Sequence, residues 1–241
     1  MKKRYRRPPH KMSSSYLNSE YNPKKKKTKF FYVDCNGDIP NITNLMLMNA
    51  KCFSRFGDAY RYWLDVVDSK LDKPAIIEVD ASTFYSKTKQ AYSICYSYRI
   101  IMNKKVVMEN TRYFGMLTEE SNEIKTCGIA EIIGATNALK DLKLLDNYKE
   151  ITDIIIRYDN KYIENIAKGQ FVAVDNEKSD VIRRCRRVYN DIYYNDNKEI
   201  YFNHVLSHTG DKAHDIIDRK AFNMNKHFEK IEVEKMKEAT A

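Results

Sequence analysis

The chain has no run of apolar residues that approaches the roughly 18 needed to cross a membrane. At its start, Met1-Lys2-Lys3-Arg4 is followed by Arg-Pro-Pro instead of an apolar stretch, which excludes the pattern of a secretory signal. We therefore expect an intracellular, cytoplasmic protein that is not secreted and does not bind a membrane. An Arg-rich, acid-poor start is also typical of organellar transit peptides, and this alternative stays open.

The chain also lacks any C-x-x-C pair. Its cysteines are odd in number and widely spaced: Cys35, Cys52, Cys95, Cys127 and Cys185. This pattern excludes both a disulfide framework and a zinc ribbon, and it predicts reduced, mostly buried thiols.

Acidic residues are scarce at the start of the chain. The formal net charge is +9, from 42 Lys and Arg against 33 Asp and Glu, but residues 1–29 carry eleven of the basic residues and one acid. This segment therefore has a net charge of +10, and the rest of the chain has −1. Because it has few aliphatic residues, we expect a disordered basic arm whose affinity for nucleic acid falls with salt. A nuclear-targeting or solubility tail is the alternative.

Length and composition allow one ordinary core and a small satellite, since 241 residues contain 43% apolar and 12% aromatic side chains. A collagen-like or largely disordered protein is excluded. After the basic arm we expect a small α+β module at 30–68, a linker at 69–74, a larger domain at 75–228 and a charged C-terminal tail at 229–241.

Hydrophobic periodicity predicts the order β-β-β-α-β-α-α-β-α for the larger domain. The expected strands are 75–80, 90–101, 104–109, 151–157 and 199–206, and the expected helices are 123–145, 161–168, 177–194 and a last one from 211. This order predicts an α/β fold in which antiparallel strands come first and βα units complete a mixed sheet.

Carboxylates stand at informative places in this pattern. Asp80 closes the first strand and Asp159 the fourth, where ligands of open α/β sheets collect. Glu131 interrupts the apolar face of the first helix, and Asp218 follows His208 by ten residues. Each acid alone is explained equally well as a cap or as a solvated charge, and His208 as a structural histidine.

Several carboxylates that converge without a fixed cation repel one another, which is typical of sites for hard divalent metals. We expect Mg²⁺, with Mn²⁺ as the alternative. Two such ions activate a water and stabilise the leaving oxygen of a phosphodiester, and a histidine such as His208 can transfer a proton at neutral pH.

These residues resemble the ribonuclease H family in chain order, over about residues 75–225. Residues 79–82 (Val-Asp-Ala-Ser) are similar to its first-strand motif, and 130–135 to its helix glutamate motif. Residues 155–169 resemble the third acidic motif with its following helix. His208-Thr209-Gly210 with Asp218 resembles the histidine loop and the final aspartate.

The resemblance implies a mixed five-stranded sheet with helices on both faces and a two-metal endoribonuclease that cleaves the RNA strand of RNA–DNA hybrids. It implies Asp80, Glu131, Asp159 and Asp218 as metal ligands and His208 as an aid to product release. Further expected contacts with nucleic acid are Ser82, Asn160 and Lys212. The partner is the hybrid itself, and no protein partner is predicted.

Some members of the family carry an N-terminal hybrid-binding domain, and residues 30–33 with 53–60 are similar to a shortened copy of it. A structural extension packed on the larger domain explains the same residues.

Several positions depart from the family pattern. Ala81 replaces a glycine, and Cys127 and Gly128 stand where polar groups near the RNA 2′-hydroxyl are common. Ala213-His214-Asp215 stands where an Asn-Glu pair is usual, and Asp215 can substitute for that acid. Selectivity for RNA would then depend on backbone groups or on groove shape.

A last candidate surface lies on the helix at 177–194, where basic residues alternate with an apolar stripe. Its arginines are Arg183, Arg184, Arg186 and Arg187. They form either a phosphate clamp or a solvated helix face. Two alternative functions also stay open: a non-catalytic nucleic-acid-binding protein on the same fold, and a nuclease of the superfamily that acts on DNA.

Overall fold

A computed structural model gives the structure of residues 30–35, 39–43, 50–87, 90–117, 126–170, 177–205 and 211–240. The expected basic arm at 1–29 lies outside these described residues. Within them, no helix combines the length and the apolar character that crossing a bilayer requires.

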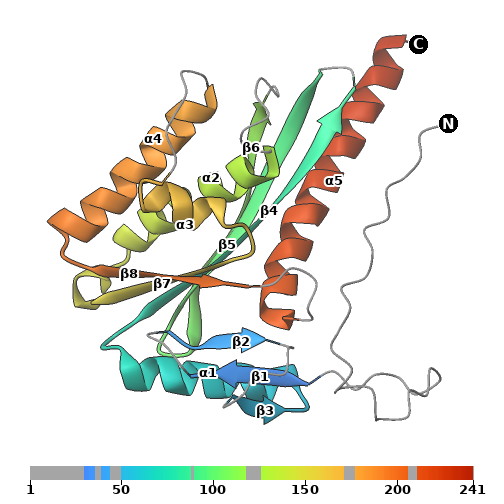
Figure 1. The fold of residues 1–241 in the computed structure, drawn as a ribbon. Coiled ribbons are helices and arrows are strands. Elements are labelled where there is room, and N and C mark those ends of the chain that lie inside the picture. Colours follow the sequence, from blue (N-terminus) through green and yellow to red (C-terminus); the bar gives the residue numbers. More distant parts are fainter. Residues whose placement is uncertain are drawn as a thin grey trace, which may run out of the picture.

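Five strands form one mixed sheet in the order β6-β5-β4-β7-β8 (Figure 1). Their bounds are β4 Ala75–Ser86, β5 Ala91–Met102, β6 Lys105–Leu117, β7 Asp153–Tyr158 and β8 Glu199–His204. β4, β5 and β6 are antiparallel neighbours, and β7 and β8 run parallel to β4. The positive φ angles of Asn103 and Lys104, 50° and 61°, form the tight turn between β5 and β6. The expected α/β mixed sheet is confirmed.

Helices cover both faces of this sheet. α2 (Thr126–Lys143), α3 (Tyr162–Ala167) and α4 (Glu177–Asn190) lie on one face, and α5 (Lys212–Thr240) lies on the other (Figure 1). The alternation of β4 explains the two layers, because Ala75, Ile77 and Val79 join the core under α2 while Ile76 joins a second core. By the same alternation, the side chains of Glu78 and Asp80 belong to the face of Ile76.

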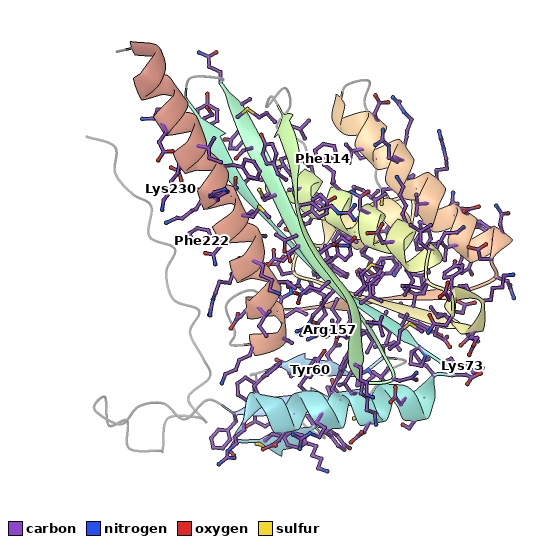
Figure 2. All side chains as sticks on the ribbon, turned by 180° about the vertical axis from the view of Figure 1, so that it is seen from behind. Tyr60, Lys73, Phe114, Arg157, Phe222 and Lys230 are labelled. Atoms are coloured by element: carbon purple, nitrogen blue, oxygen red, sulfur yellow. The ribbon has the colours of Figure 1, made fainter. Side chains whose placement is uncertain are left out.

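The N-terminal module packs on this second face. It consists of β1 (Phe31–Asp34), β2 (Asn41–Thr43), β3 (Lys51–Phe53) and the helix α1 (Phe56–Lys70). Trp63 and Val67 of α1 are fully buried in one cluster with Ile155 of β7. Seen from behind, Tyr60 and Arg157 lie between α1 and the sheet (Figure 2). The module therefore shares a core with the larger sheet.

Four elements extend well beyond their expected ends. β6, expected at 104–109, continues to Leu117 because it pairs with β5 along nearly the whole length of that strand. β4 continues past Asp80 to Ser86, because its antiparallel pairing with β5 goes on after its parallel pairing with β7 has ended at Glu78. α1 extends to Lys70, inside the expected linker. The segment expected as a tail, residues 229–241, belongs as far as Thr240 to the single helix α5.

All five cysteines are free thiols, as expected. Only Cys95 and Cys185 are buried, however, so the expectation of mostly buried thiols was wrong. Cys52 is exposed because it lies on the short strand β3. Cys127 is exposed because it lies in the first turn of α2, beside a cavity.

Gly134 marks the closest approach of α2 to the sheet. A Cβ atom placed on it would lie 2.9 Å from Cγ2 of Val79 and 3.1 Å from Cβ of Tyr96. Both neighbours are buried in strands and cannot move away freely. Gly57, in the first turn of α1, would meet nothing within 4 Å.

We expect Gly134→Ala to lower the free energy of unfolding by about 1 to 3 kcal/mol, because overpacking outweighs the gain in helix propensity. Gly57→Ala is the matched control, and it should be neutral or stabilising by up to about 1 kcal/mol. Urea unfolding followed by circular dichroism measures both. A stabilised Gly134→Ala variant would show that α2 and the sheet have room to separate.

Candidate active site

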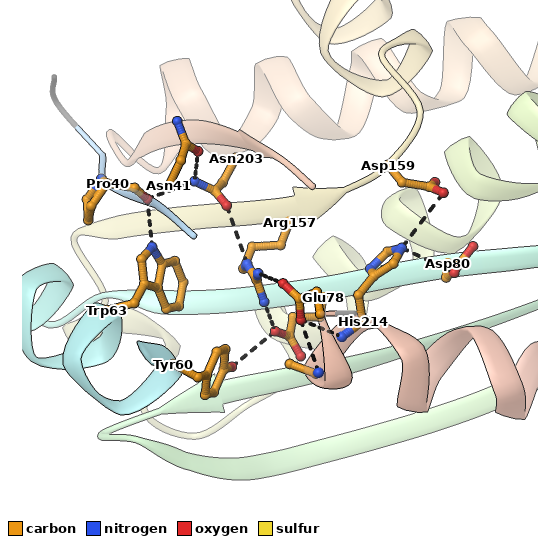
Figure 3. Close-up of polar contacts among 12 residues, drawn as sticks. Pro40, Asn41, Tyr60, Trp63, Glu78, Asp80, Arg157, Asp159, Asn203 and His214 are labelled. Atoms are coloured by element: carbon orange, nitrogen blue, oxygen red, sulfur yellow. Dashed lines mark hydrogen bonds and ion pairs between the residues drawn. The ribbon is translucent and has the colours of Figure 1, made fainter. Parts of the chain in front are cut away.

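Asp80 and Asp159 meet at the point where β4 and β7 part. The two strands pair in parallel as far as Glu78 and Arg157, and each acid stands two residues further along the chain, Asp80 within β4 and Asp159 just after the end of β7. His214, in the first turn of α5, reaches the same place. Its Nε2 lies 3.2 Å from Oδ2 of Asp80 and 4.0 Å from Oδ2 of Asp159 (Figure 3). One potential metal-ligand atom from each residue lies within 4.8 Å of the other two.

Glu131 and Asp218 complete the acidic wall of a cavity of about 420 Å³. Cys127, Asn160, Lys161 and Asp215 also line it. Glu131 comes from the buried side of α2, and Asn160 Nδ2 donates to its Oε1 over 3.4 Å. Among the described residues, the other oxygen, Oε2, is buried and has no hydrogen-bond partner. The cavity therefore brings together five carboxylates from four different segments, since Asp215 and Asp218 both belong to α5.

Burial and mutual repulsion disturb the protonation of these groups. Burial, followed by the charges of Asp159 and Asp80, raises the pKa of Glu131 well above its ordinary value. Burial also raises the pKa of Asp80, although His214 and the Ala81 amide, 2.6 Å from Oδ1, oppose it. For His214, burial acts to lower the pKa, but Asp80 and Asp159 outweigh it and raise the pKa.

The donor set of the cavity fits a divalent cation. A positive ion would relieve the repulsion of several like charges in one cavity, and it would satisfy the buried Glu131 oxygen that has no partner in the described part of the chain. Carboxylate oxygens are the ligands of Mg²⁺ and Mn²⁺, and an imidazole nitrogen extends the choice toward softer metals. Asp80, Glu131, Asp159 and Asp218 would hold the ion, with His214 next to them.

The sequence prediction named these four acids, and the structure places all four on one cavity. Asp80 lies within β4 and not at its end, as the extension of that strand explains. His208 lies outside the described residues. Sequence reasoning did not name His214 as a site residue. Its signal was the spacing of four residues from Asp218, which places both side chains on one face of a helix.

The residues expected to contact nucleic acid are dispersed. Asn160 lines the cavity, and its Oδ1 also accepts from the Tyr162 amide at the start of α3, over 3.1 Å. Ser82 accepts from Asn225 of α5 over 3.3 Å. Lys212 is exposed at the first residue of α5.

The four arginines of α4 divide into two groups. Arg183, Arg186 and Arg187 line a hollow of about 810 Å³, together with Tyr194 of the π-helical turn at Asp191–Asn195. Arg184 lines a different, small hollow beside Phe114 of β6. The helix therefore does not present its arginines as a single face.

The sheet order, with three antiparallel strands followed by two parallel ones, and the acidic cavity beside β4 and β7 define a ribonuclease H-like fold. No protein-family profile and no curated protein sequence matches the chain.

Among solved structures, ribonuclease H1 from the archaeon Halobacterium salinarum NRC-1 has 15% identity and a TM-score of 0.46, over 62% of this chain and 98% of its own. The N-terminal RNase H domain of rv2228c from Mycobacterium tuberculosis has 14% identity and a TM-score of 0.47, over 64% and 97%. LC11-RNase H1 in complex with an RNA/DNA hybrid has 14% identity and a TM-score of 0.44, over 60% and 94%. The fold assignment itself depends on the strand order.

The raised pKa of Glu131 predicts how stability depends on pH. The folded protein holds a proton that the unfolded chain releases at lower pH, so the free energy of unfolding decreases as pH rises from about 4.5 through the raised pKa. In EDTA we expect Glu131→Gln to be more stable than wild type at pH 8, by about 1 kcal/mol.

Urea unfolding at pH 5.5 and pH 8 measures this difference, and Glu150→Gln, an exposed acid, serves as the control. Because His214 also has a raised pKa, its contribution is present below pH about 6.5 and decreases as pH rises. Some dependence therefore remains in the variant. If the free energy of unfolding had the same pH dependence in wild type and in Glu131→Gln, the raised pKa of Glu131 would be contradicted.

Proposed function

We propose that this protein is a divalent-metal-dependent endoribonuclease of the ribonuclease H type, acting on the RNA strand of RNA–DNA hybrids. The observation that carries the proposal is the convergence of Asp80, Glu131, Asp159 and Asp218 on one open cavity. A bound Mg²⁺ pair would supply a nucleophilic water and stabilise the leaving oxygen of the phosphodiester.

The chain's own residues prepare this cavity. The Ala81 amide fixes one oxygen of Asp80, and Asn160 holds Glu131 while it also orders the start of α3. Lys161 lines the cavity and offers a positive charge to a scissile phosphate. His208 stays a prediction from the sequence, in the role of assisting product release.

The preference for RNA is the finer part of the proposal. Cys127 lines the cavity and is exposed, so it stands where a group beside the 2′-hydroxyl would lie if the family pattern holds. A thiol is a weak donor and acceptor. Recognition of the RNA strand would then depend on backbone groups and on the width of the groove.

One observation favours the alternative of a non-catalytic nucleic-acid-binding protein. His214 Nε2 lies between Asp80 and Asp159, and both acids favour its protonated form. An imidazolium there already supplies positive charge to the acidic cluster. Catalysis requires that a divalent metal bind the cluster in spite of this competitor.

Cleavage of a labelled hybrid tests the proposal. We expect Asp159→Asn to lower Mg²⁺-dependent cleavage by about 10³-fold or more, because a lost ligand removes several kcal/mol of transition-state stabilisation. Hybrid binding in EDTA should persist. The control is Asp65→Asn, an exposed acid of α1 that pairs with Lys104 over 2.6 Å.

The substrates to compare are the hybrid, duplex DNA, duplex RNA and a four-way junction. Cutting of the hybrid alone supports the full proposal, and cutting of DNA selects the DNA nuclease. Saturable hybrid binding without any metal-dependent cleavage selects the non-catalytic alternative. If Asp159→Asn still cleaved the hybrid, Asp159 would not be a ligand of the catalytic metal and the proposed active site would be wrong.

The hollow on α4 refines where a phosphate would bind. Arg187 lines it with two other arginines, whereas Arg184, three residues away and also exposed, does not. We expect Arg187→Ala to reduce the slope of log affinity against log salt concentration by about 0.9, the value for one duplex phosphate contact. Arg184→Ala removes the same charge and should leave the slope unchanged. Fluorescence anisotropy with the hybrid measures both slopes. If the two variants changed the slope equally, the hollow would contribute only general positive charge and would not be a phosphate-binding site.

A further inference from the structure

Four charged side chains are buried together behind the acidic cavity. Glu78 and Arg157 are 0% and 1% exposed, and Arg99 and Asp211 are 8% and 6% exposed. Arg157 donates from one nitrogen to Glu78 Oε1 and from another to Asp211 Oδ2 (Figure 3). Arg99 donates to Glu78 Oε2. Two acids and two arginines make this network electrically neutral.

The N-terminal module closes the network. The Tyr60 hydroxyl donates to Glu78 Oε1 over 3.0 Å. The guanidinium carbon of Arg157 lies 4.8 Å from the ring centroid of Trp63 and 5.5 Å from that of Tyr60. Asn203 of β8 accepts from Arg157 over 3.4 Å and donates to the Pro40 carbonyl over 3.0 Å.

Trp63 is held in place from the module side as well. Its indole nitrogen donates to the same Pro40 carbonyl over 2.6 Å. Asn203 also donates to Asn41 Oδ1 over 2.6 Å. The module is thus joined to Arg157 directly through aromatic rings and indirectly through Asn203.

The two chain segments that carry Asp80 and Asp159 also carry residues of the buried ion network. Glu78 precedes Asp80 by two residues on β4, and Arg157 precedes Asp159 by two residues at the end of β7. Residues two apart in a strand share a face and lie about 6.6 Å apart. The position of Glu78 therefore constrains that of Asp80 within β4, and Arg157 holds the end of β7 from which the chain continues to Asp159.

Asp211 makes the same connection for α5. Its Oδ1 accepts from the backbone amides of Ala213 and His214, each over 3.0 Å, and so caps the helix. The first turn then carries His214, and the next turn carries Asp218. Through Arg157, the start of this helix is tied to β4 and β7.

Stability alone does not require such a network, because well-packed apolar residues replace buried ion pairs at little or no cost. What an ion network adds is a defined geometry among the elements that it joins. We infer that the N-terminal module is a scaffold of the active site: Tyr60 and Trp63 hold Arg157, and Glu78, Arg157 and Asp211 are positioning residues for the metal-binding carboxylates. This inference rests on the proposed metal-dependent function.

Removing one hydroxyl group tests the inference in the full-length protein. Tyr60→Phe deletes the donor to Glu78 and leaves the aromatic ring beside Arg157. We expect the dissociation constant for Mn²⁺, measured by calorimetry, to rise about 10-fold, the lower end of the loss seen when a group that orients metal ligands is removed. The Mg²⁺ concentration for half-maximal cleavage should rise by the same factor, with KM for the hybrid unchanged at saturating Mg²⁺.

Tyr62→Phe is the matched control. It deletes the same atom from the same helix, but Tyr62 packs on Phe53 inside the module, with ring centroids 5.3 Å apart. Its Mn²⁺ affinity should equal that of wild type. Arg157→Lys is a second variant, because lysine keeps the charge but lacks the planar fork that reaches Glu78 and Asp211 together. We expect it to weaken Mn²⁺ binding more than Tyr60→Phe.

The outcomes separate the two proposals. Unchanged Mn²⁺ affinity in Tyr60→Phe, or an equal loss in Tyr62→Phe, would overturn the scaffold role while leaving the metal-dependent function in place. Failure of wild type to bind Mn²⁺ would overturn the proposed function and the scaffold role with it. If Arg157→Lys does not fold, the two tyrosine variants still decide.

Discussion

The parallel pairing of β4 with β7 is the constraint on which the candidate site depends. It joins Ala75–Glu78 to Ile154–Arg157 and then stops, while antiparallel pairing with β5 keeps β4 extended to Ser86. Asp80 and Asp159 therefore stand side by side where the sheet opens. A slip of one residue would turn a whole strand over and move its acid to the opposite face, so the buried alternation of β4 also protects the site.

Two sets of buried charges stand next to each other on the same elements, and they differ in how they are satisfied. Glu78, Arg157 and their partners neutralise one another, and the module aromatics exclude water from them. Two residues further along the chain from Glu78 and from Arg157, the carboxylates line one cavity, and an oxygen of Glu131 has no partner among the described residues. The first set gives order, and the second stores repulsion that a bound proton, the His214 imidazolium or an added cation relieves. Sites that bind metals commonly give up stability in this way.

Much of the fold was predictable because its signals are local. Alternation and helical periodicity gave the order of strands and helices. Asp80 and Asp159 were found from the expected strand ends, Glu131 from the apolar helix face that it interrupts, and Asp218 from its position after His208 and its likeness to a family motif. The end of β4 was missed because β4 stays extended as long as its neighbour β5 pairs with it, and this pairing goes on after the pairing with β7 has ended. His214 was missed because its position in the cluster depends on where the first turn of α5 lies. Asp211 caps that turn, and Arg157, from a distant part of the chain, holds Asp211 in place.

The sequence by itself determined the mixed sheet and the concentration of positive charge in residues 1–29, because these follow from short-range periodicity and from composition. It also predicted which acids form the candidate site, from strand ends, an interrupted apolar helix face and the likeness of short motifs to a known family. Only the tertiary structure decided that the aromatic residues of the module close a buried ion network behind the site. It also decided that the arginines of α4 face two different hollows. The physical reason is that burial, pairing of distant charges and the direction of a helix face arise from packing between segments, on which no local pattern carries information.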